Sequence, residues 1–122
     1  MKQQITTDQA PGAPQFLSQA IVSNGLIFVS GQGCVDAENK LTTEQKLAQI
    51  MKNISAILRA ADATLNDIVK VTVYVTDMAL MPELNKAYPS YFSEPYPARE
   101  AVCVKALPLE MDIEISVIAA RS

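Results

Sequence analysis

Two charged residues in otherwise apolar segments are the first candidates for chemistry. Arg99 begins an apolar, strand-like run, and Glu114 lies between two isoleucines. The planar guanidinium of an arginine can hold a carboxylate through two parallel hydrogen bonds, and a glutamate can position a water molecule and move a proton. Two structural interpretations remain open: Arg99 could form a salt bridge with Glu100, Glu114 or a neighbouring chain, and Glu114 could simply face solvent.

The register between two strands decides whether these side chains can act together. The runs 99–105 and 112–120 are predicted to be strands that form a hairpin. If Ala101 lay opposite Glu114, Arg99 and Glu114 would be diagonal neighbours on one face, with backbones roughly 7–8 Å apart. That gap fits a small carboxylate and a water molecule. A register shifted by one residue would place the two side chains on opposite faces.

The composition limits the chemistry of any such site. The 122 residues include no His and no Trp, which removes the usual general base, the histidine-dependent nucleophiles and His-containing zinc sites. The two cysteines, Cys34 and Cys103, are too few for a disulfide framework or a cysteine-rich metal site. We interpret both as small hydrophobic residues in a reduced, cytoplasmic protein.

The charge and length predict one domain, 1–122, that binds neither nucleic acid nor membranes. There are 10 basic and 13 acidic residues, so the net charge of −3 provides no basic surface for a phosphate backbone. Hydrophobic residues make up 49% of the chain, which is enough for a real core at this length. No apolar run resembles a signal peptide or a membrane span.

Hydrophobic periodicity predicts the elements in the first half of the chain. Two apolar runs, 20–22 and 26–30, flank an Asn-Gly turn and predict a β-hairpin. The glycines after Ser30 do not form a phosphate-binding motif, and we interpret them as a tight turn that ends the strand. Apolar residues at three- and four-residue steps from position 41 to 61 predict an amphipathic helix, which Thr42 and Gln45 would begin as a capping box.

The second half adds a strand, a helix and the two terminal strands. Strict alternation over 68–76 predicts a half-buried strand, and a second helix is expected from about 82 to 92, shortened or bent at Pro89. The element order predicts a mixed α+β sheet with two helices packed on one face. The uncovered face would carry Lys70, Thr72 and Tyr74, so we expect it to be buried in a homo-oligomer.

Several ordered segments together resemble the RidA family, also called the YjgF family, over essentially the whole length. They are Ala10-Pro11, Ser18-Gln19-Ala20-Ile21, Phe28-Val29-Ser30-Gly31-Gln32, Asn53-Ile54, the run 67–78, Tyr96-Pro97-Ala98-Arg99, Leu107-Pro108 and Ile113-Glu114-Ile115. The resemblance implies a chorismate-mutase-like fold that forms a homotrimer with a central β-barrel and three ligand clefts between subunits.

The resemblance also implies an activity and roles for site residues. The activity is cofactor-free hydrolysis of reactive 2-imino acids or their enamine tautomers, such as 2-iminobutanoate and 2-iminopropanoate, to 2-keto acids and ammonia. Arg99 would bind the substrate carboxylate, and Glu114 would orient the attacking water. Backbone groups near Ala101 and Ser30 would line the cleft.

The remaining predicted binding residues include departures from the family pattern. Tyr91 or Phe92 would form a wall of the cleft. Leu17 replaces an aromatic residue common in the family, and Ala101 replaces a frequent cysteine. Two other functions stay open: a non-catalytic trimer that binds a small carboxylate or regulates a partner, and the endoribonuclease or translation-inhibitor activity of older family names. The acidic charge and the missing His weaken the latter.

Overall fold

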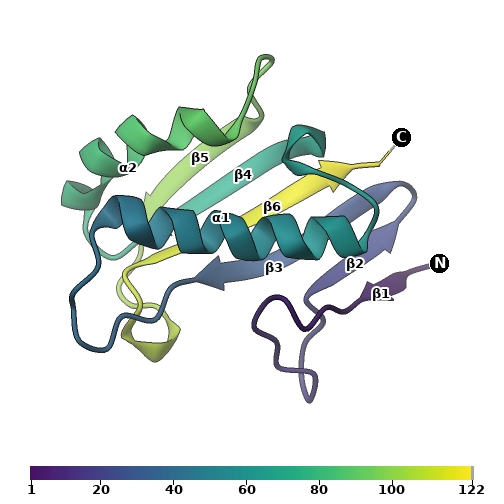
Figure 1. The fold of residues 1–122 in the computed structure, drawn as a ribbon, viewed down its shortest axis with the longest axis horizontal. Helices are drawn as coiled ribbons and strands as arrows, with labels where there is room; N and C mark the ends of the chain where they lie inside the picture. Colours follow the sequence, from purple (N-terminus) through teal and green to yellow (C-terminus); the bar gives the residue numbers. More distant parts are fainter. Residues whose placement is uncertain (122) are drawn as a thin grey trace.

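The computed structural model describes residues 1–121 as a six-stranded mixed sheet with α-helices on one face (Figure 1). The spatial order of the strands is β1-β2-β3-β6-β4-β5. The strands are β1 (Gln3–Ile5), β2 (Ala20–Ser23), β3 (Leu26–Gly33), β4 (Ile68–Val75), β5 (Ala98–Cys103) and β6 (Ile113–Ala120). The predicted α+β class is therefore confirmed, with one extra edge strand, β1, that the sequence patterns did not predict.

The hairpin of β2 and β3 forms as predicted, but β3 continues beyond the expected turn. Asn24 and Gly25 have φ values of 52° and 77°, which suit the two-residue turn between the strands. The register of β3 against β6 shifts between Val29 and Gln32, so Ser30 and Gly31 lie in a bulge within the strand. The interpretation of these glycines as a strand-ending turn was wrong.

Helix α1 (Thr43–Ala60) begins with the predicted capping box, in which Thr42 and Gln45 each bond the backbone of the other. Its apolar face is fully buried against the sheet. Two polar residues of this helix, Lys46 and Asn53, are also buried. Lys46 can be buried because its ammonium group lies 2.9 Å from the carboxylate of Asp112.

The middle of the chain follows the prediction with two local changes. The alternating valines of β4 are fully buried except Val69, which is exposed because the register against β6 shifts between Ile68 and Lys70. The second helical stretch consists of α2 (Met81–Ala87) and the 3-10 turn η3 (Tyr88–Tyr91). Pro89 lacks an N–H donor, which explains why the α-helix ends before it.

The predicted hairpin between the terminal strands was wrong. β4 lies between them: it pairs with β5 in parallel and with β6 in antiparallel orientation. The connection 104–112, which contains the 3-10 turn η4 (Pro108–Glu110), crosses from one side of β4 to the other. Short-range periodicity identifies both strands but carries no information about which strand each one pairs with.

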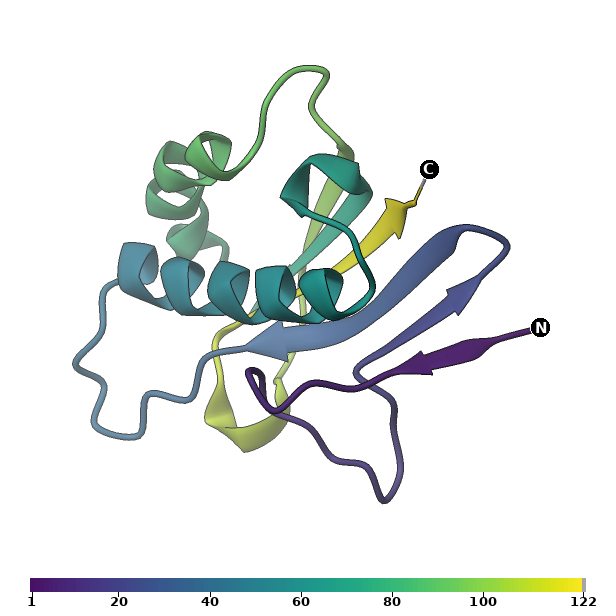
Figure 2. The ribbon, with the colours of Figure 1, turned by 45° about the vertical axis from the view of Figure 1, so that its right-hand side comes forward.

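Both helices lie on the same side of the sheet, and no helix or strand of residues 1–121 covers the other side (Figure 2). Lys70, Thr72 and Tyr74 lie on this open face and are partly exposed, as predicted. Within residues 1–121, no helix has both the length and the apolar character needed to cross a membrane.

Candidate active site

The guanidinium of Arg99 is held at the edge of the sheet by one residue of α2 and one residue of η3. Arg99 pairs with Val71 of β4, whose side chain is buried under the helices, so both side chains share the helix-covered face. One guanidinium nitrogen donates a 2.8 Å hydrogen bond to Oδ1 of Asn85. The guanidinium carbon also lies 4.8 Å from the centre of the Tyr88 ring. These contacts orient Arg99 while its side chain remains exposed.

Arg99 has no acidic partner among residues 1–121, so the salt-bridge interpretation of this residue does not apply within one chain. Its neighbour Glu100 points to the open face and pairs with Lys70 at 3.2 Å. An arginine has five N–H donors, and Asn85 takes only one. The others are available for an external anion.

Glu114 lies on β6 with its carboxylate packed against Gly31. The neighbours Ile113 and Ile115 are fully buried, so Glu114 points to the open face, where it is half-buried. A Cβ atom on Gly31 would lie only 2.7 Å from the carboxyl carbon of Glu114. A glycine in the β3 bulge is therefore what allows the carboxylate to lie here.

Within one chain, Arg99 and Glu114 point to opposite faces of the sheet. The register connects Arg99 to Val71, whereas Glu114 is opposite Tyr74, three positions further along β4. An odd spacing along a strand places side chains on opposite faces. The predicted diagonal pairing across a hairpin was therefore wrong, and a single chain cannot hold one small molecule between these two groups.

Tyr88 is the central aromatic residue beside Arg99, and sequence reasoning missed it together with Asn85. Its ring is buried, its hydroxyl lacks a hydrogen-bond partner among residues 1–121, and burial raises the pKa of this hydroxyl. The ring of Phe92 lies 4.7 Å away, so this predicted wall residue lies near Arg99. Tyr91 instead lines a separate groove between α1 and α2.

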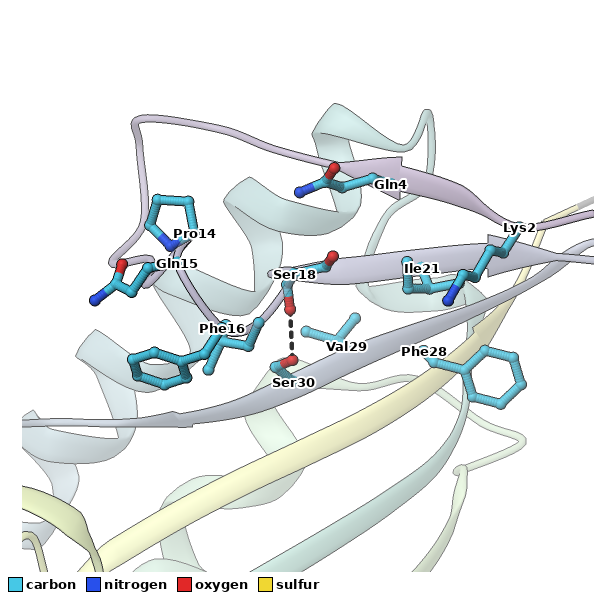
Figure 3. Close-up of a pocket in the computed structure, with 11 residues that line it drawn as sticks. Lys2, Gln4, Pro14, Gln15, Phe16, Ser18, Ile21, Phe28, Val29 and Ser30 are labelled. Atoms are coloured by element: carbon cyan, nitrogen blue, oxygen red, sulfur yellow. Dashed lines mark hydrogen bonds between the residues drawn. The ribbon is translucent and has the colours of Figure 1, made fainter.

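Of the other predicted binding residues, one lies beside Arg99 and one lies near Glu114. Ala101 follows Arg99 on the same face of β5 and is partly buried beside Val73. Ser30 lies near Glu114, at the β3 bulge. Its hydroxyl donates a 2.7 Å hydrogen bond to the carbonyl of Ser18, beside the groove drawn in Figure 3. Its backbone N–H donates to the carbonyl of Gln19, so neither donor of Ser30 is free.

The loop that carries Leu17 is held by one buried side chain. The amide of Gln19 accepts a hydrogen bond from the N–H of Thr7 and donates to the carbonyls of Thr7, Ala10 and Pro11 at 2.9–3.0 Å. Leu17 lies at the end of this loop with its side chain exposed. The polar pair Ser18-Gln19 of the family pattern therefore holds the loop that carries Leu17 in place.

The cysteines lie outside this arrangement. Cys34 is buried, and burial together with the negative charge of Asp36 raises the pKa of its thiol. A protonated, buried thiol is a poor nucleophile, which agrees with the interpretation of Cys34 as a hydrophobic residue. Cys103 is an exposed free thiol at the end of β5.

Comparisons with known proteins agree with this fold over its full length. The family model described as Endoribonuclease L-PSP matches residues 7–121. Reactive Intermediate Deaminase A from Arabidopsis thaliana is 38% identical, over 97% of this chain and 65% of that protein. Yeast Mmf1 is 34% identical, with a TM-score of 0.92 and complete coverage of both chains. TdcF of E. coli with bound serine is 32% identical, with a TM-score of 0.83 over 98% of this chain and 99% of that one.

The fold and these matches define a mixed α+β protein of the Rid class, with its helices on one face of the sheet. The chain belongs to the Endoribonuclease L-PSP family, which is also called the RidA or YjgF family. The resemblance in the ordered sequence segments is thus confirmed.

Proposed function

We propose that the protein hydrolyses reactive 2-imino acids, including 2-iminobutanoate and 2-iminopropanoate, and their enamine tautomers to 2-keto acids and ammonia. Family membership and the deaminase relative support this class of reaction. The observation that carries the proposal is the guanidinium of Arg99, which Asn85 and Tyr88 orient although no carboxylate neutralises it within residues 1–121. A prearranged cation with free N–H donors suits the carboxylate of a small acid.

Arg99 would bind the carboxylate that every 2-imino acid carries. Two parallel N–H···O bonds fix both the position and the plane of the substrate, which a single point charge does not do. Orientation of this kind lowers the activation barrier, because the reacting atoms are already close when water attacks.

Glu114 would supply the acid and base steps. The oxygen of water attacks the protonated imine carbon while the carboxylate of Glu114 accepts a proton from the water, and a carbinolamine forms. Glu114 then returns the proton to the amine nitrogen. The C–N bond breaks, the hydroxyl gives its proton to the carboxylate of Glu114 as its oxygen becomes the ketone oxygen, and the departing ammonia takes up this proton to leave as ammonium. No electron transfer occurs, so these steps need neither a metal ion nor an organic cofactor.

The opposite orientations of Arg99 and Glu114 support a site shared between subunits. A second copy of the chain can place its Glu114 opposite the Arg99 of the first, and three copies related by a rotation axis would form three equivalent sites. The proposal therefore includes the homotrimer with a central β-barrel, whose contacts would cover the open face. It also includes a cytoplasmic location, because Cys34 and Cys103 are free thiols.

The test is release of 2-ketobutanoate and ammonia while a threonine dehydratase generates the imine. Arg99→Ala should lose at least about 100-fold in kcat/KM, and Arg99→Lys should also fail because a point charge lacks the bidentate geometry. The matched control is Arg59→Ala, which removes an exposed arginine at the end of α1. Equal activity in Arg99→Ala, Arg59→Ala and wild type would remove Arg99 from the mechanism.

One observation favours a second function, a trimer that binds small carboxylates without turnover. The structure of TdcF, which is similar to this chain, contains bound serine. In that case 2-ketobutanoate would bind to wild type and not to Arg99→Ala, while ammonia release would equal the uncatalysed rate in both proteins.

A further inference from the structure

A second pocket, of about 450 Å³, lies between α1, the end of β3 and the loop that joins them. Three side-chain amides of α1 line it: Gln45, Gln49 and Asn53. Residues four positions apart lie on one face of a helix, and successive members are about 6 Å apart along its axis. Among residues 1–121, no charged side chain lines this pocket. A row of neutral hydrogen-bonding groups therefore faces the space.

Asn53 is a buried polar residue whose hydrogen bonds are incomplete. Its side chain lines the pocket although the residue is only 3% exposed. Its oxygen accepts a 2.9 Å hydrogen bond from the amide nitrogen of Gln49, whereas its own nitrogen donates to no group within residues 1–121. Buried polar groups are almost always hydrogen-bonded. The free N–H donors of Asn53 therefore indicate that an acceptor binds in the pocket.

The bond between the two amides also determines what Gln49 presents. Because its nitrogen donates to Asn53, its oxygen remains a free acceptor. Gln45 uses its oxygen to accept the N–H of Thr42, so its nitrogen remains a further donor. The row thus offers both donors and an acceptor. An amide group carries a C=O and an N–H and can satisfy both kinds, whereas a carboxylate has acceptors alone and an ammonium has donors alone.

The other lining residues are mostly apolar. Pro11, Val35 and Leu41 lie around the opening, and Val35 is 56% and Leu41 39% exposed. Cys34 also lines the pocket and is itself buried. An apolar ring between these side chains would remove their exposed surface from water. Apolar walls with a few directed polar groups are typical of small-molecule sites.

The loop that supplies this apolar wall is held in place by Asp36. Its carboxylate accepts hydrogen bonds from the backbone N–H groups of Lys40 and Leu41. Its charge is balanced by the ammonium of Lys46, 3.9 Å away. The wall is therefore formed before a ligand binds, which lowers the cost of ordering it. A charged ligand would lose its hydration here without gaining an opposite charge.

This pocket is separate from the groups proposed for hydrolysis. In the sheet, β6 and β4 lie between β3 and the strand that carries Arg99, so three strand spacings, about 14 Å, separate the two edges. Glu114 points to the open face, whereas the three amides belong to α1, which covers the opposite face (Figure 2).

We infer that this pocket binds a small neutral molecule that carries a carboxamide or lactam group on an apolar ring. The donors and acceptor of the α1 amides would bind its C=O and N–H, and the apolar wall would contact the ring. The volume is within the range of about 300–1,000 Å³ that is usual for small-ligand sites. This binding is additional to the proposed hydrolysis and does not depend on it.

The test uses nicotinamide, a neutral carboxamide on a planar ring, and nicotinate, which has a carboxylate in its place. Each is titrated into the isotope-labelled protein, and NMR follows the side-chain NH₂ signals of Gln49 and Asn53. We expect these signals to shift to saturation with nicotinamide at a Kd of about 1 mM. Nicotinate should bind there at least about tenfold more weakly. Signals that do not shift, or that shift equally with both compounds, would overturn the inference.

Three variants locate the binding. Gln49→Ala removes the free acceptor and the bond that orients Asn53, and it should fold because Gln49 is exposed and alanine favours helices. It should weaken nicotinamide binding by at least about fivefold. Lys52→Ala, an exposed position of the same helix that does not line the pocket, is the matched control. Arg99→Ala should bind nicotinamide like wild type. Equal affinity in Gln49→Ala and Lys52→Ala, or loss of binding in Arg99→Ala, would contradict the assignment.

Discussion

The surroundings of Arg99 and Glu114 differ in construction. Arg99 lies on an edge strand and is held by contacts from α2 and η3, with Asn85 on one side and Tyr88 on the other. Glu114 lies on an inner strand and forms no hydrogen bond or ion pair with its side chain within residues 1–121; Gly31 gives it room. The proposed anion-binding group is thus oriented within one chain, whereas the side chain of the proposed acid–base group forms no polar contact there.

The largest effect is expected when Arg99 and Glu114 are removed from different chains. Arg99→Ala and Glu114→Gln should each be inactive as homotrimers. Co-expression of both variants should restore activity, because a site that takes its arginine from one chain and its glutamate from another is then intact. Each trimer that contains both variants has one intact site of its three, so activity per mixed trimer should be about a third of wild type. Activity per trimer, measured after purification through two different affinity tags, checks this.

The matched control co-expresses two differently tagged copies of Arg99→Ala, which should stay inactive. If the mixed trimers of Arg99→Ala and Glu114→Gln are also inactive although they assemble, the two groups do not share a site between subunits.

Gly31→Ala should disturb the position of Glu114 and leave the surroundings of Arg99 unchanged. The added methyl group would overlap the carboxylate and displace it, and a displacement of about 1 Å can lower the rate by about 10- to 100-fold. We expect kcat to fall and KM to change little, because Arg99 still binds the substrate. Ser116→Ala, on the same face of β6, is the control. A normal kcat in Gly31→Ala would show that the position of Glu114 is unimportant.

Substitutions of Tyr88 test how the surroundings of Arg99 hold its guanidinium. Tyr88→Leu removes the ring beneath the guanidinium and should raise KM by about fivefold, the usual value of a partly exposed cation–π contact. Tyr88→Phe keeps the ring and removes a buried hydroxyl that lacks a partner, so the free energy of unfolding should rise by about 1 kcal/mol. Steady-state kinetics and urea unfolding of both variants check this. Equal KM values for the two variants would contradict the role of the ring.

The smallest effect is expected from the charged contacts near the start of β6, the strand that carries Glu114. Asp36 accepts hydrogen bonds from the N–H groups of Lys40 and Leu41 and lies 3.9 Å from the ammonium of Lys46. These backbone bonds, with a smaller contribution from Lys46, hold the pKa of Asp36 below its ordinary value of 3.8. Its stabilisation is therefore complete above pH 3.8 and is lost as the pH falls through the lowered pKa.

Urea unfolding of wild type and Asp36→Asn at pH 6 and pH 3 measures this effect. The variant should be less stable at pH 6, and the difference should shrink at pH 3. A difference that stays constant between the two pH values would mean that Asp36 does not contribute through its charge.

Local sequence signals predicted the elements because each depends on neighbouring residues. The Asn-Gly hairpin, the capping box at Thr42 and, from Val71 onward, the alternation of β4 all formed where the pattern placed them. The pairing of β5 was not predictable in this way, because the connection 104–112 can return beside β5 or cross β4. Arg99 and Glu114 could be selected from the sequence as candidates for chemistry, but their relative orientation depended on that pairing.

Asn85 and Tyr88 were missed for a related reason. They lie three residues apart, one helical turn, and that spacing is visible in the sequence. Nothing in the sequence connects the turn with Arg99, however, because the contact requires η3 to pack over the start of β5. The third contact in this cluster, Phe92, was predicted only through family resemblance.

The hydrogen bonds of Gln19 affect how the loop that leads to Leu17 can move. The described hydrogen bonds that tie residues 7–11 to the rest of the chain converge on its one amide. The loop that leads to Leu17 should therefore open and close as one cooperative unit rather than residue by residue.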